Sequence, residues 1–146
     1  MNILVLHGPN LNLLGEREPD VYGTTTLAEV NAMIRAEARK LGLTARIFQK
    51  NGEGQLIDLL HRHRRWAHAV VLNGGAYTHY SYALRDAVAG VRLPTVEVHL
   101  SDIRKREPFR RVSVTAPVCV AQIMGKGPQG YLDALALLKA RRQSPR

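Results

Sequence analysis

The chain opens with Met1-Asn-Ile-Leu-Val-Leu-His7, which is followed directly by Gly8-Pro-Asn10. A short apolar run that ends at glycine, proline and asparagine is typical of a buried strand. The next segment, residues 8–25, is rich in glycine, proline and asparagine and predicts a long loop. A loop of more than about 12 residues is uncommon inside a compact domain and is usually functional or disordered. The opening therefore predicts a buried strand that leads into a functional segment.

Strand and helix patterns alternate along the rest of the chain. Thr26-Leu-Ala-Glu29 matches a capping box and predicts the start of a helix that carries Leu41 on its apolar side. Such alternation indicates right-handed crossovers and a parallel sheet with helices on both faces. We therefore expect an α/β protein with a flavodoxin-like three-layer fold, whose five-stranded parallel sheet has the order 2-1-3-4-5. The later strands are expected at residues 43–49, 67–72, 94–99 and 118–124, and the later helices at residues 53–65, 78–88 and 130–141.

The length of 146 residues fits one domain of ordinary size. We expect a single flavodoxin-like catalytic domain over residues 1–141 and a disordered tail over residues 142–146. Cys119 is the single cysteine, so an internal disulfide is excluded, which agrees with a reducing compartment. The first apolar run is too short for a signal peptide, and no stretch approaches the roughly 20 apolar residues that span a bilayer. The sequence therefore predicts a cytoplasmic protein.

The chain is basic, with 21 Lys and Arg against 12 Asp and Glu and a formal charge of +9. This charge fits a nucleic-acid partner, an anionic small substrate or solubility alone. The segment Gly125-Lys-Gly-Pro-Gln-Gly130 also matches G-x-G-x-x-G. It follows the last expected strand, however, so neither a further strand nor an acidic ribose partner has room after it. The net charge and this glycine pattern are the support for one alternative function, a basic flavodoxin-like module that binds nucleotide or RNA without catalysis.

Polar side chains gather where three of the expected strands end. In a sheet of this order, ligands lie beyond the carboxyl ends of the strands, at the switch point between strands 1 and 3. The polar segments are residues 7–23, residues 73–79 and residues 97–101. Taken singly, each residue has a plain structural interpretation: Asn10 can form a turn and Tyr22 can pack on the surface. Because the segments converge on one edge of one sheet, a site is favoured.

The same segments resemble a known family. The motif at residues 7–19, Tyr22-Gly23, residues 73–79, residues 97–101, Arg106, Phe109-Arg110 and Gly130-Tyr131 are similar to those of the type II 3-dehydroquinate dehydratases. The resemblance covers residues 1–138. It implies conversion of 3-dehydroquinate to 3-dehydroshikimate and water, a step of the shikimate pathway, or the reverse reaction in quinate breakdown. It further implies no cofactor, no metal, no nucleic-acid or membrane partner, and a homo-oligomer that is a dodecamer built from trimers.

The resemblance assigns catalytic roles to five residues. It implies that Tyr22 removes a proton from C2 of the substrate and that Arg17 helps this tyrosine to ionise. Asn10, acting through a bound water, would stabilise the resulting enolate. His99 would donate a proton to the departing C1 hydroxyl, and Glu97 would orient His99.

Seven further residues are implied as substrate contacts. Side chains would hold the substrate hydroxyls, and backbone N–H groups after the fourth strand would meet the substrate carboxylate. One carboxylate would reach the site of a neighbouring subunit. In chain order, these residues are Asn73, His79, Asp86, Leu100, Ser101, Arg106 and Arg110.

The chain departs from the usual family pattern at Gly74-Gly75, Tyr80 and Val112. None of these positions supplies a catalytic group in the assignment above. We therefore expect the departures to affect substrate affinity and subunit packing rather than the chemistry.

Overall fold

Five parallel strands form one sheet in the order β2-β1-β3-β4-β5. The structure, a computed structural model, describes residues 1–144. The predicted flavodoxin-like α/β fold with strand order 2-1-3-4-5 is confirmed. The strands are β1 (Asn2–His7), β2 (Thr44–Gln49), β3 (Ala69–Asn73), β4 (Thr95–His99) and β5 (Ala121–Met124).

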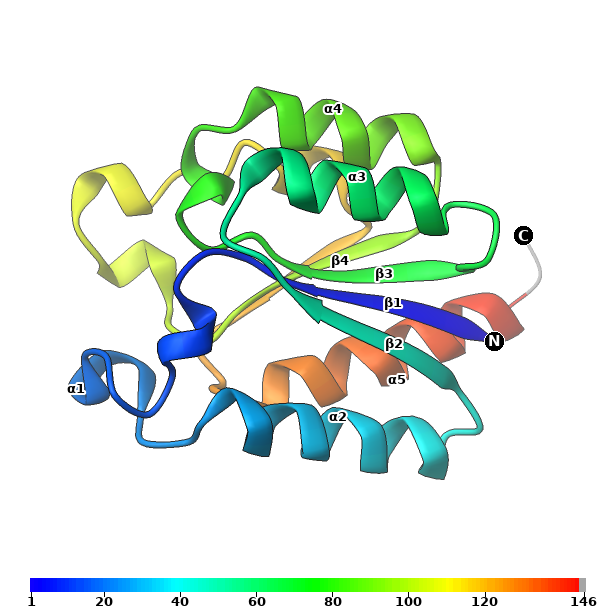
Figure 1. Ribbon diagram of the computed structural model, residues 1–146, viewed down its shortest axis with the longest axis horizontal. Coiled ribbons are helices and arrows are strands. Elements are labelled where there is room, and N and C mark those ends of the chain that lie inside the picture. The colour runs from blue at the N-terminus through cyan, green and yellow to red at the C-terminus, as the bar shows by residue number, and fades with distance from the viewer. Residues whose placement is uncertain (145–146) are drawn as a thin grey trace.

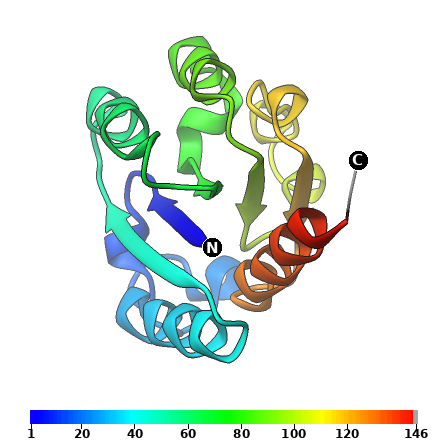
Figure 2. The same cartoon turned by 90° about the vertical axis from the view of Figure 1, so that its right-hand side faces the viewer.

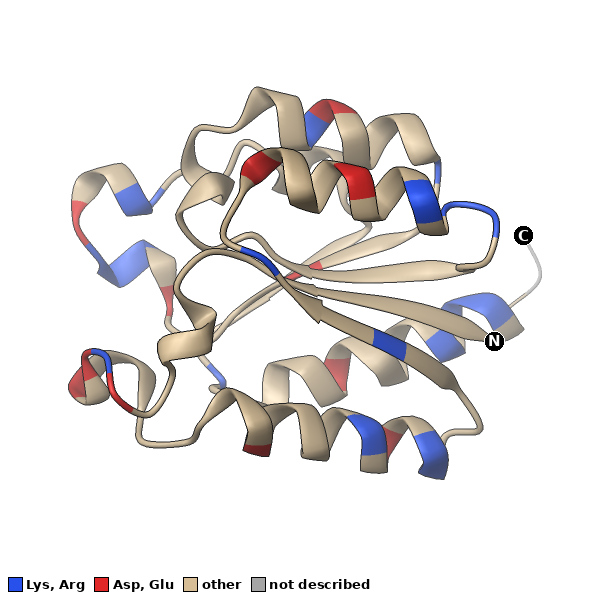
Figure 3. Cartoon of the chain, in the orientation of Figure 1, with Lys and Arg blue, Asp and Glu red and all other residues tan. Residues whose placement is uncertain are grey.

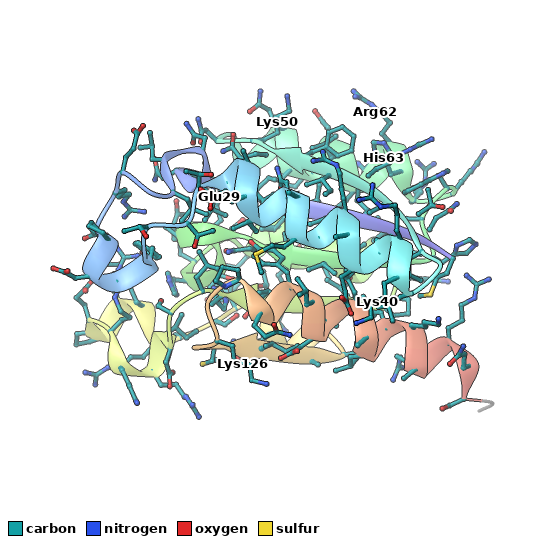
Figure 4. The ribbon with its side chains drawn as sticks, turned by 90° about the horizontal axis from the view of Figure 1, so that it is seen from below. Glu29, Lys40, Lys50, Arg62, His63 and Lys126 are labelled. Carbon is teal, nitrogen blue, oxygen red and sulfur yellow. The ribbon has the colours of Figure 1, made fainter. Side chains whose placement is uncertain are left out.

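Helices cover both faces of this sheet. Figures 1 and 2 show α3 and α4 on one face and α2 and α5 on the other, and Figure 4 looks onto the face made by α2 and α5. Among the described residues, no helix is long and apolar enough to cross a membrane. The α-helices are α1 (Pro19–Tyr22), α2 (Leu27–Lys40), α3 (Glu53–His63), α4 (Tyr82–Val91) and α5 (Gln129–Gln143). Short 3-10 helices are η1 (Leu11–Leu13), η2 (Gly75–His79), η3 (Ile103–Lys105), η4 (Pro108–Arg110) and η5 (Ala116–Val118).

The alternation of side chains along the central strand creates two cores. In β1, Ile3 and Val5 pack into the cluster beneath α2 and α5, whereas Leu4 and Leu6 pack into the cluster beneath α3 and α4. All four side chains are fully buried. A central strand that is buried on both faces is apolar at successive positions, which explains the unbroken run at the start of the chain.

Some element boundaries differ from those predicted. Thr26 does cap α2, because its hydroxyl accepts a hydrogen bond from the N–H of Glu29 at 3.2 Å. The helix expected from Thr78 begins instead at Tyr82, because residues 75–79 form η2 and Ser81 provides the cap. At the other end of the chain, α5 continues to Gln143, two residues into the segment predicted to be disordered. The last two residues of that predicted tail lie outside the described part of the chain.

The carboxyl ends of the strands meet at one edge. His7 pairs with Asn73 across β1 and β3, and Leu72 pairs with Glu97 across β3 and β4. The chain then leaves each strand toward the same side, where Figure 1 shows α1 and the connection after β4 next to each other at the left. Figure 3 shows charges of both signs on these connecting segments. The topology therefore brings the three predicted polar segments together.

Candidate active site

A cavity of about 170 Å³ lies beyond the carboxyl ends of β1, β3 and β4. Glu97 lies behind the lining and Asp86 is exposed on α4, so neither belongs to it. Ten of the twelve predicted site residues line this cavity: Asn10, Arg17, Tyr22, Asn73, His79, His99, Leu100, Ser101, Arg106 and Arg110.

Two guanidinium groups flank the phenol of Tyr22, the last residue of α1. The Arg106 Nη1 donates a hydrogen bond to the Tyr22 hydroxyl at 3.2 Å and another to the Ser101 hydroxyl at 3.3 Å. The Cζ atoms of Arg17 and Arg106 lie 5.2 and 5.4 Å from the centre of the tyrosine ring. Arg106, predicted as a substrate contact, is thus also the cation in direct hydrogen-bond contact with the phenol.

Glu97 is a fully buried carboxylate at the end of β4. It accepts a hydrogen bond from His99 Nε2 at 3.0 Å. Burial alone would raise the pKa of Glu97, but the hydrogen bond and charge of His99, together with other donors, lower it to about 2. Glu97 is therefore anionic, and it holds a proton on His99 Nε2. This leaves His99 Nδ1 as the nitrogen able to act on a ligand in the cavity.

The donors around Glu97 come from residues that the sequence analysis did not single out. They are the hydroxyls of Thr78 and Ser113, at 3.0 and 2.9 Å, the amide of Gln122 at 2.6 Å, and the hydroxyl of Thr115. Burial of a carboxylate without partners is costly, so these groups make the buried anion possible. No spacing in the sequence links them to residue 97, because they meet it only through the fold.

His79 at the end of η2 and Arg110 at the end of η4 also line the cavity. His79 Nδ1 lies 2.7 Å from the backbone oxygen of Val112, and its ring stacks on that of His99 with centroids 6.5 Å apart. Burial lowers the pKa of His79, and the hydrogen bond to Val112 acts in the opposite sense. Arg110 Nε donates to Glu107 at 2.6 Å. The departure at Val112 thus leaves a backbone contact of the site in place.

The segment around Asn10 is held by backbone contacts. Asn10 has a positive φ of 69°, and its N–H donates to Asn51 Oδ1 at 3.0 Å. Gly75 also has a positive φ, of 57°, and an added Cβ there would lie 3.1 Å from Pro9. The departure at Gly75 therefore fits the close approach of the loops that follow β1 and β3.

A buried polar cluster lies behind the cavity and was not predicted. His7 contacts the Tyr131 hydroxyl through Nδ1 at 2.9 Å and Asn31 Oδ1 through Nε2 at 2.8 Å. Asn73 Nδ2 donates to the same hydroxyl at 3.0 Å. Burial lowers the pKa of His7 to about 4, against the effect of the Asn31 hydrogen bond, and burial raises the pKa of Tyr131. In the sequence, His7, Asn73 and Tyr131 each belong to a family-like motif, but Asn73 alone was predicted as a site residue.

The shifted pKa of His7 predicts loss of stability in acid. An unfolded chain protonates His7 below pH 6.5, whereas the folded chain does so only near pH 4. Stability therefore falls as the pH drops through this window, by roughly 2 to 3 kcal/mol. Denaturant titrations between pH 7 and 4.5 should show this loss in the parent and a clearly smaller one in His7→Gln. His61→Gln, at an exposed histidine, should behave like the parent; equal pH dependence in all three proteins would contradict the prediction.

The fold and the cavity together define a class. The chain is a parallel α/β protein with acid–base groups and several cations around a small cavity at the switch point of its sheet, as in enzymes that act on small anionic molecules. Within residues 1–144, no group of three His, Cys, Asp or Glu side chains is placed to hold one metal ion. The expectation that no cofactor is needed stays a prediction.

Comparison with known proteins gives the family. The family model described as "Dehydroquinase class II" matches residues 1–139. The 3-dehydroquinate dehydratase of Pelotomaculum thermopropionicum is 58% identical over 135 residues, which are 92% of this chain and 94% of the relative. That of Ruegeria pomeroyi is 57% identical over 139 residues, 95% of this chain and 93% of the relative. The crystal structure of the type II dehydroquinase from Butyrivibrio crossotus superposes with a TM-score of 0.93 at 44% identity, covering 94% of this chain and 97% of the other. The chain belongs to the class II dehydroquinase family.

Proposed function

We propose that this chain is a type II 3-dehydroquinate dehydratase, a hydro-lyase of the shikimate pathway that converts 3-dehydroquinate to 3-dehydroshikimate and water. The observation that carries the proposal is the meeting of two acid–base groups on one cavity: Tyr22 flanked by two guanidinium groups, and His99 held by Glu97. The alternative of a non-catalytic nucleotide- or RNA-binding module is not favoured, because binding without catalysis does not require two acid–base groups on one cavity.

The proposed reaction begins with removal of a proton from C2, next to the ketone. Tyr22, as a phenolate between Arg17 and Arg106, takes this proton, and the bonding electrons move into the ketone to form an enolate. Asn10, through a water, provides a donor for the enolate oxygen. The enolate then re-forms the ketone as the C1–O bond breaks. His99 acts in this step as the imidazolium: Nε2 keeps the proton bonded to Glu97, and Nδ1 gives its proton to the departing hydroxyl, so that water leaves by anti elimination.

The remaining cavity groups bind the rest of the substrate in this proposal. Asn73, His79 and Arg110 contact the ring hydroxyls. The backbone N–H groups of Leu100 and Ser101 receive the carboxylate, where Arg106 adds positive charge through its contact with the Ser101 hydroxyl. The excess of cations around the cavity matches the charge of the substrate.

An absorbance assay tests the function directly. The product contains a conjugated enone, so ultraviolet absorbance should rise when protein and 3-dehydroquinate are mixed. Borohydride added with the substrate should not inactivate the protein, because no lysine lines the cavity and no Schiff base is expected. A folded protein that gives no rise in ultraviolet absorbance would contradict the proposal. A trapped adduct would instead assign the chemistry to an unrelated, lysine-dependent mechanism.

We further propose that the active form is a dodecamer built from trimers, in which Asp86 of one subunit reaches the site of the next. Asp86 is exposed on α4 and lies outside its own cavity, near the exposed aromatic rings of Tyr80 and Tyr82. Exposed aromatic side chains gathered on one surface are typical of an interface. A cytoplasmic location agrees with a single cysteine that is not in a disulfide.

The assembly proposal predicts a single large species in solution and weaker substrate binding in Asp86→Ala. A contact across subunits makes substrate binding and assembly thermodynamically linked. Light scattering on a size-exclusion column gives the mass, and initial rates give the KM. Asp58→Ala, at a charged position outside the cavity lining on α3, is the matched control and should leave the KM unchanged. A fully active monomer at low micromolar concentration would contradict both the oligomer and the shared site.

A further inference from the structure

A chain of hydrogen bonds runs from the cavity into the interior through four elements. It joins Asn73 at the end of β3, Tyr131 in α5, His7 at the end of β1 and Asn31 in α2, with distances of 3.0, 2.9 and 2.8 Å between successive polar atoms. Tyr131 and His7 are fully buried. Of the four residues, Asn73 alone belongs to the cavity lining, so the others can act on a ligand only through it.

The proton positions along this chain of hydrogen bonds follow from its Asn73 end, where a backbone contact fixes the side-chain amide. The N–H of Gly75 donates to Asn73 Oδ1 at 3.1 Å, which sets the orientation of the amide and turns Nδ2 toward Tyr131. The tyrosine hydroxyl therefore accepts from Asn73 and must donate its single proton to His7 Nδ1. His7 then carries its ring proton on Nε2 and donates it to Asn31 Oδ1. In every hydrogen bond of this series, the donor is the residue nearer the cavity and the acceptor is the residue nearer α2.

The opposite direction would leave two donors facing each other. A proton on His7 Nδ1 would turn the Tyr131 proton toward Asn73, where it would meet Nδ2. Rotating the amide to avoid this contact would set its NH₂ group against the N–H of Gly75. Buried donors without acceptors are strongly disfavoured. The low pKa of His7, which results from burial, agrees with the neutral ring that the chain requires.

We propose that Tyr131, His7 and Asn31 are positioning residues that hold the Asn73 amide with one N–H free for the substrate, so that Asn73 recognises an acceptor oxygen. Nδ2 carries two hydrogens, and Tyr131 takes one of them. The other serves a ligand in the cavity. This inference rests on the proposed function in so far as Asn73 is a substrate contact; the direction of the chain does not depend on that function.

The first test determines the direction of the hydrogen bonds from the tautomer of His7, and it requires no catalytic turnover. Solid-state ¹⁵N spectra of histidine-labelled protein distinguish the protonated from the bare ring nitrogen, and His7→Gln identifies the signals of His7 by their loss. We expect the Nε2–H tautomer in the parent at neutral pH and a mixture of tautomers in Tyr131→Phe. An Nδ1–H tautomer or a charged ring in the parent would overturn the proposal, whatever the activity of the protein.

The second test asks whether Tyr131 acts through Asn73. Removing the hydroxyl in Tyr131→Phe should raise the KM for 3-dehydroquinate about tenfold and change kcat by less than about threefold. In an Asn73→Ala background, where the amide is already absent, Tyr131→Phe should add little. If the two substitutions instead multiply each other's effects, Tyr131 does not act through Asn73 and the proposal fails.

A matched control separates positioning from general loss of stability. Thr95 is fully buried at the start of β4, at the other end of the sheet, and its hydroxyl donates to the oxygen of Leu93 at 3.0 Å. Thr95→Val also removes one buried hydroxyl, and it should lower stability with the KM unchanged. If Tyr131→Phe does not fold, Asn31→Ala takes its place: it should raise the KM while His7 keeps the Nε2–H tautomer, because the Tyr131 hydroxyl still donates to Nδ1, and an unchanged KM would overturn the proposal. A parent that turns over no 3-dehydroquinate would refute the proposed function and leave the tautomer test intact.

Discussion

Tyr22→Phe is expected to lower kcat by about a thousandfold or more, because it removes the only oxygen that can take the C2 proton in the proposed reaction. The ring itself stays in place, since it packs at the edge of the core beneath α2 and α5. The thermal midpoint should therefore change little. The lost hydrogen bond is the one donated by Arg106, which retains its second contact to Ser101.

Tyr82→Phe is the matched control for this substitution. It removes the same hydroxyl from a tyrosine that is 67% exposed on α4 and lies outside the cavity lining, and it should keep full activity, because the ring on which the proposed subunit interface relies is retained. Absorbance of the product gives the rate, and exchange of the C2 hydrogen in D₂O gives the proton-removal step by itself. Both should be lost in Tyr22→Phe. Activity within about tenfold of the parent would assign proton removal to another group.

The fold could be predicted because its signals are local. The unbroken apolar run of β1, the capping residue Thr26 and the alternation of strands and helices are each visible within a few residues. Boundaries were less predictable where two local signals compete. Thr78 and Ser81 can both cap a helix, and the tertiary contact of the Thr78 hydroxyl with Glu97 decides that Ser81 caps α4.

The polar segments that line the site were predictable from local signals and the strand order, and the family resemblance supplied the individual residues, including Arg106 and Arg110, whereas the supporting groups were not predicted. Ten of the predicted residues reach one cavity because parallel strands all end at one edge of the sheet. The donors to Glu97 and the chain behind Asn73 join residues that are up to 124 positions apart, such as His7 and Tyr131. A buried hydroxyl or amide has no periodic pattern along the chain, and its partner is set only when the elements pack.

His99→Gln is expected to lower kcat by about a thousandfold through a different step. A glutamine amide can still donate to Glu97, so the buried carboxylate keeps a partner in place of the 3.0 Å hydrogen bond from Nε2. This matters because a buried charge that loses a partner is strongly destabilising, and unfolding would mask the chemistry. The substitution thus removes the proton donor to the departing hydroxyl while leaving the surroundings of Glu97 satisfied.

The two substitutions should separate the two halves of the reaction. In D₂O, His99→Gln should still exchange the C2 hydrogen of the substrate, because Tyr22 and its flanking guanidinium groups are unchanged. The enolate would form and return many times before water is lost, so ¹H NMR should show loss of the C2 signal ahead of product. Tyr22→Phe should show neither exchange nor product. If His99→Gln loses exchange as completely as it loses turnover, then His99 takes part in proton removal and the assignment of acid and base must be redrawn.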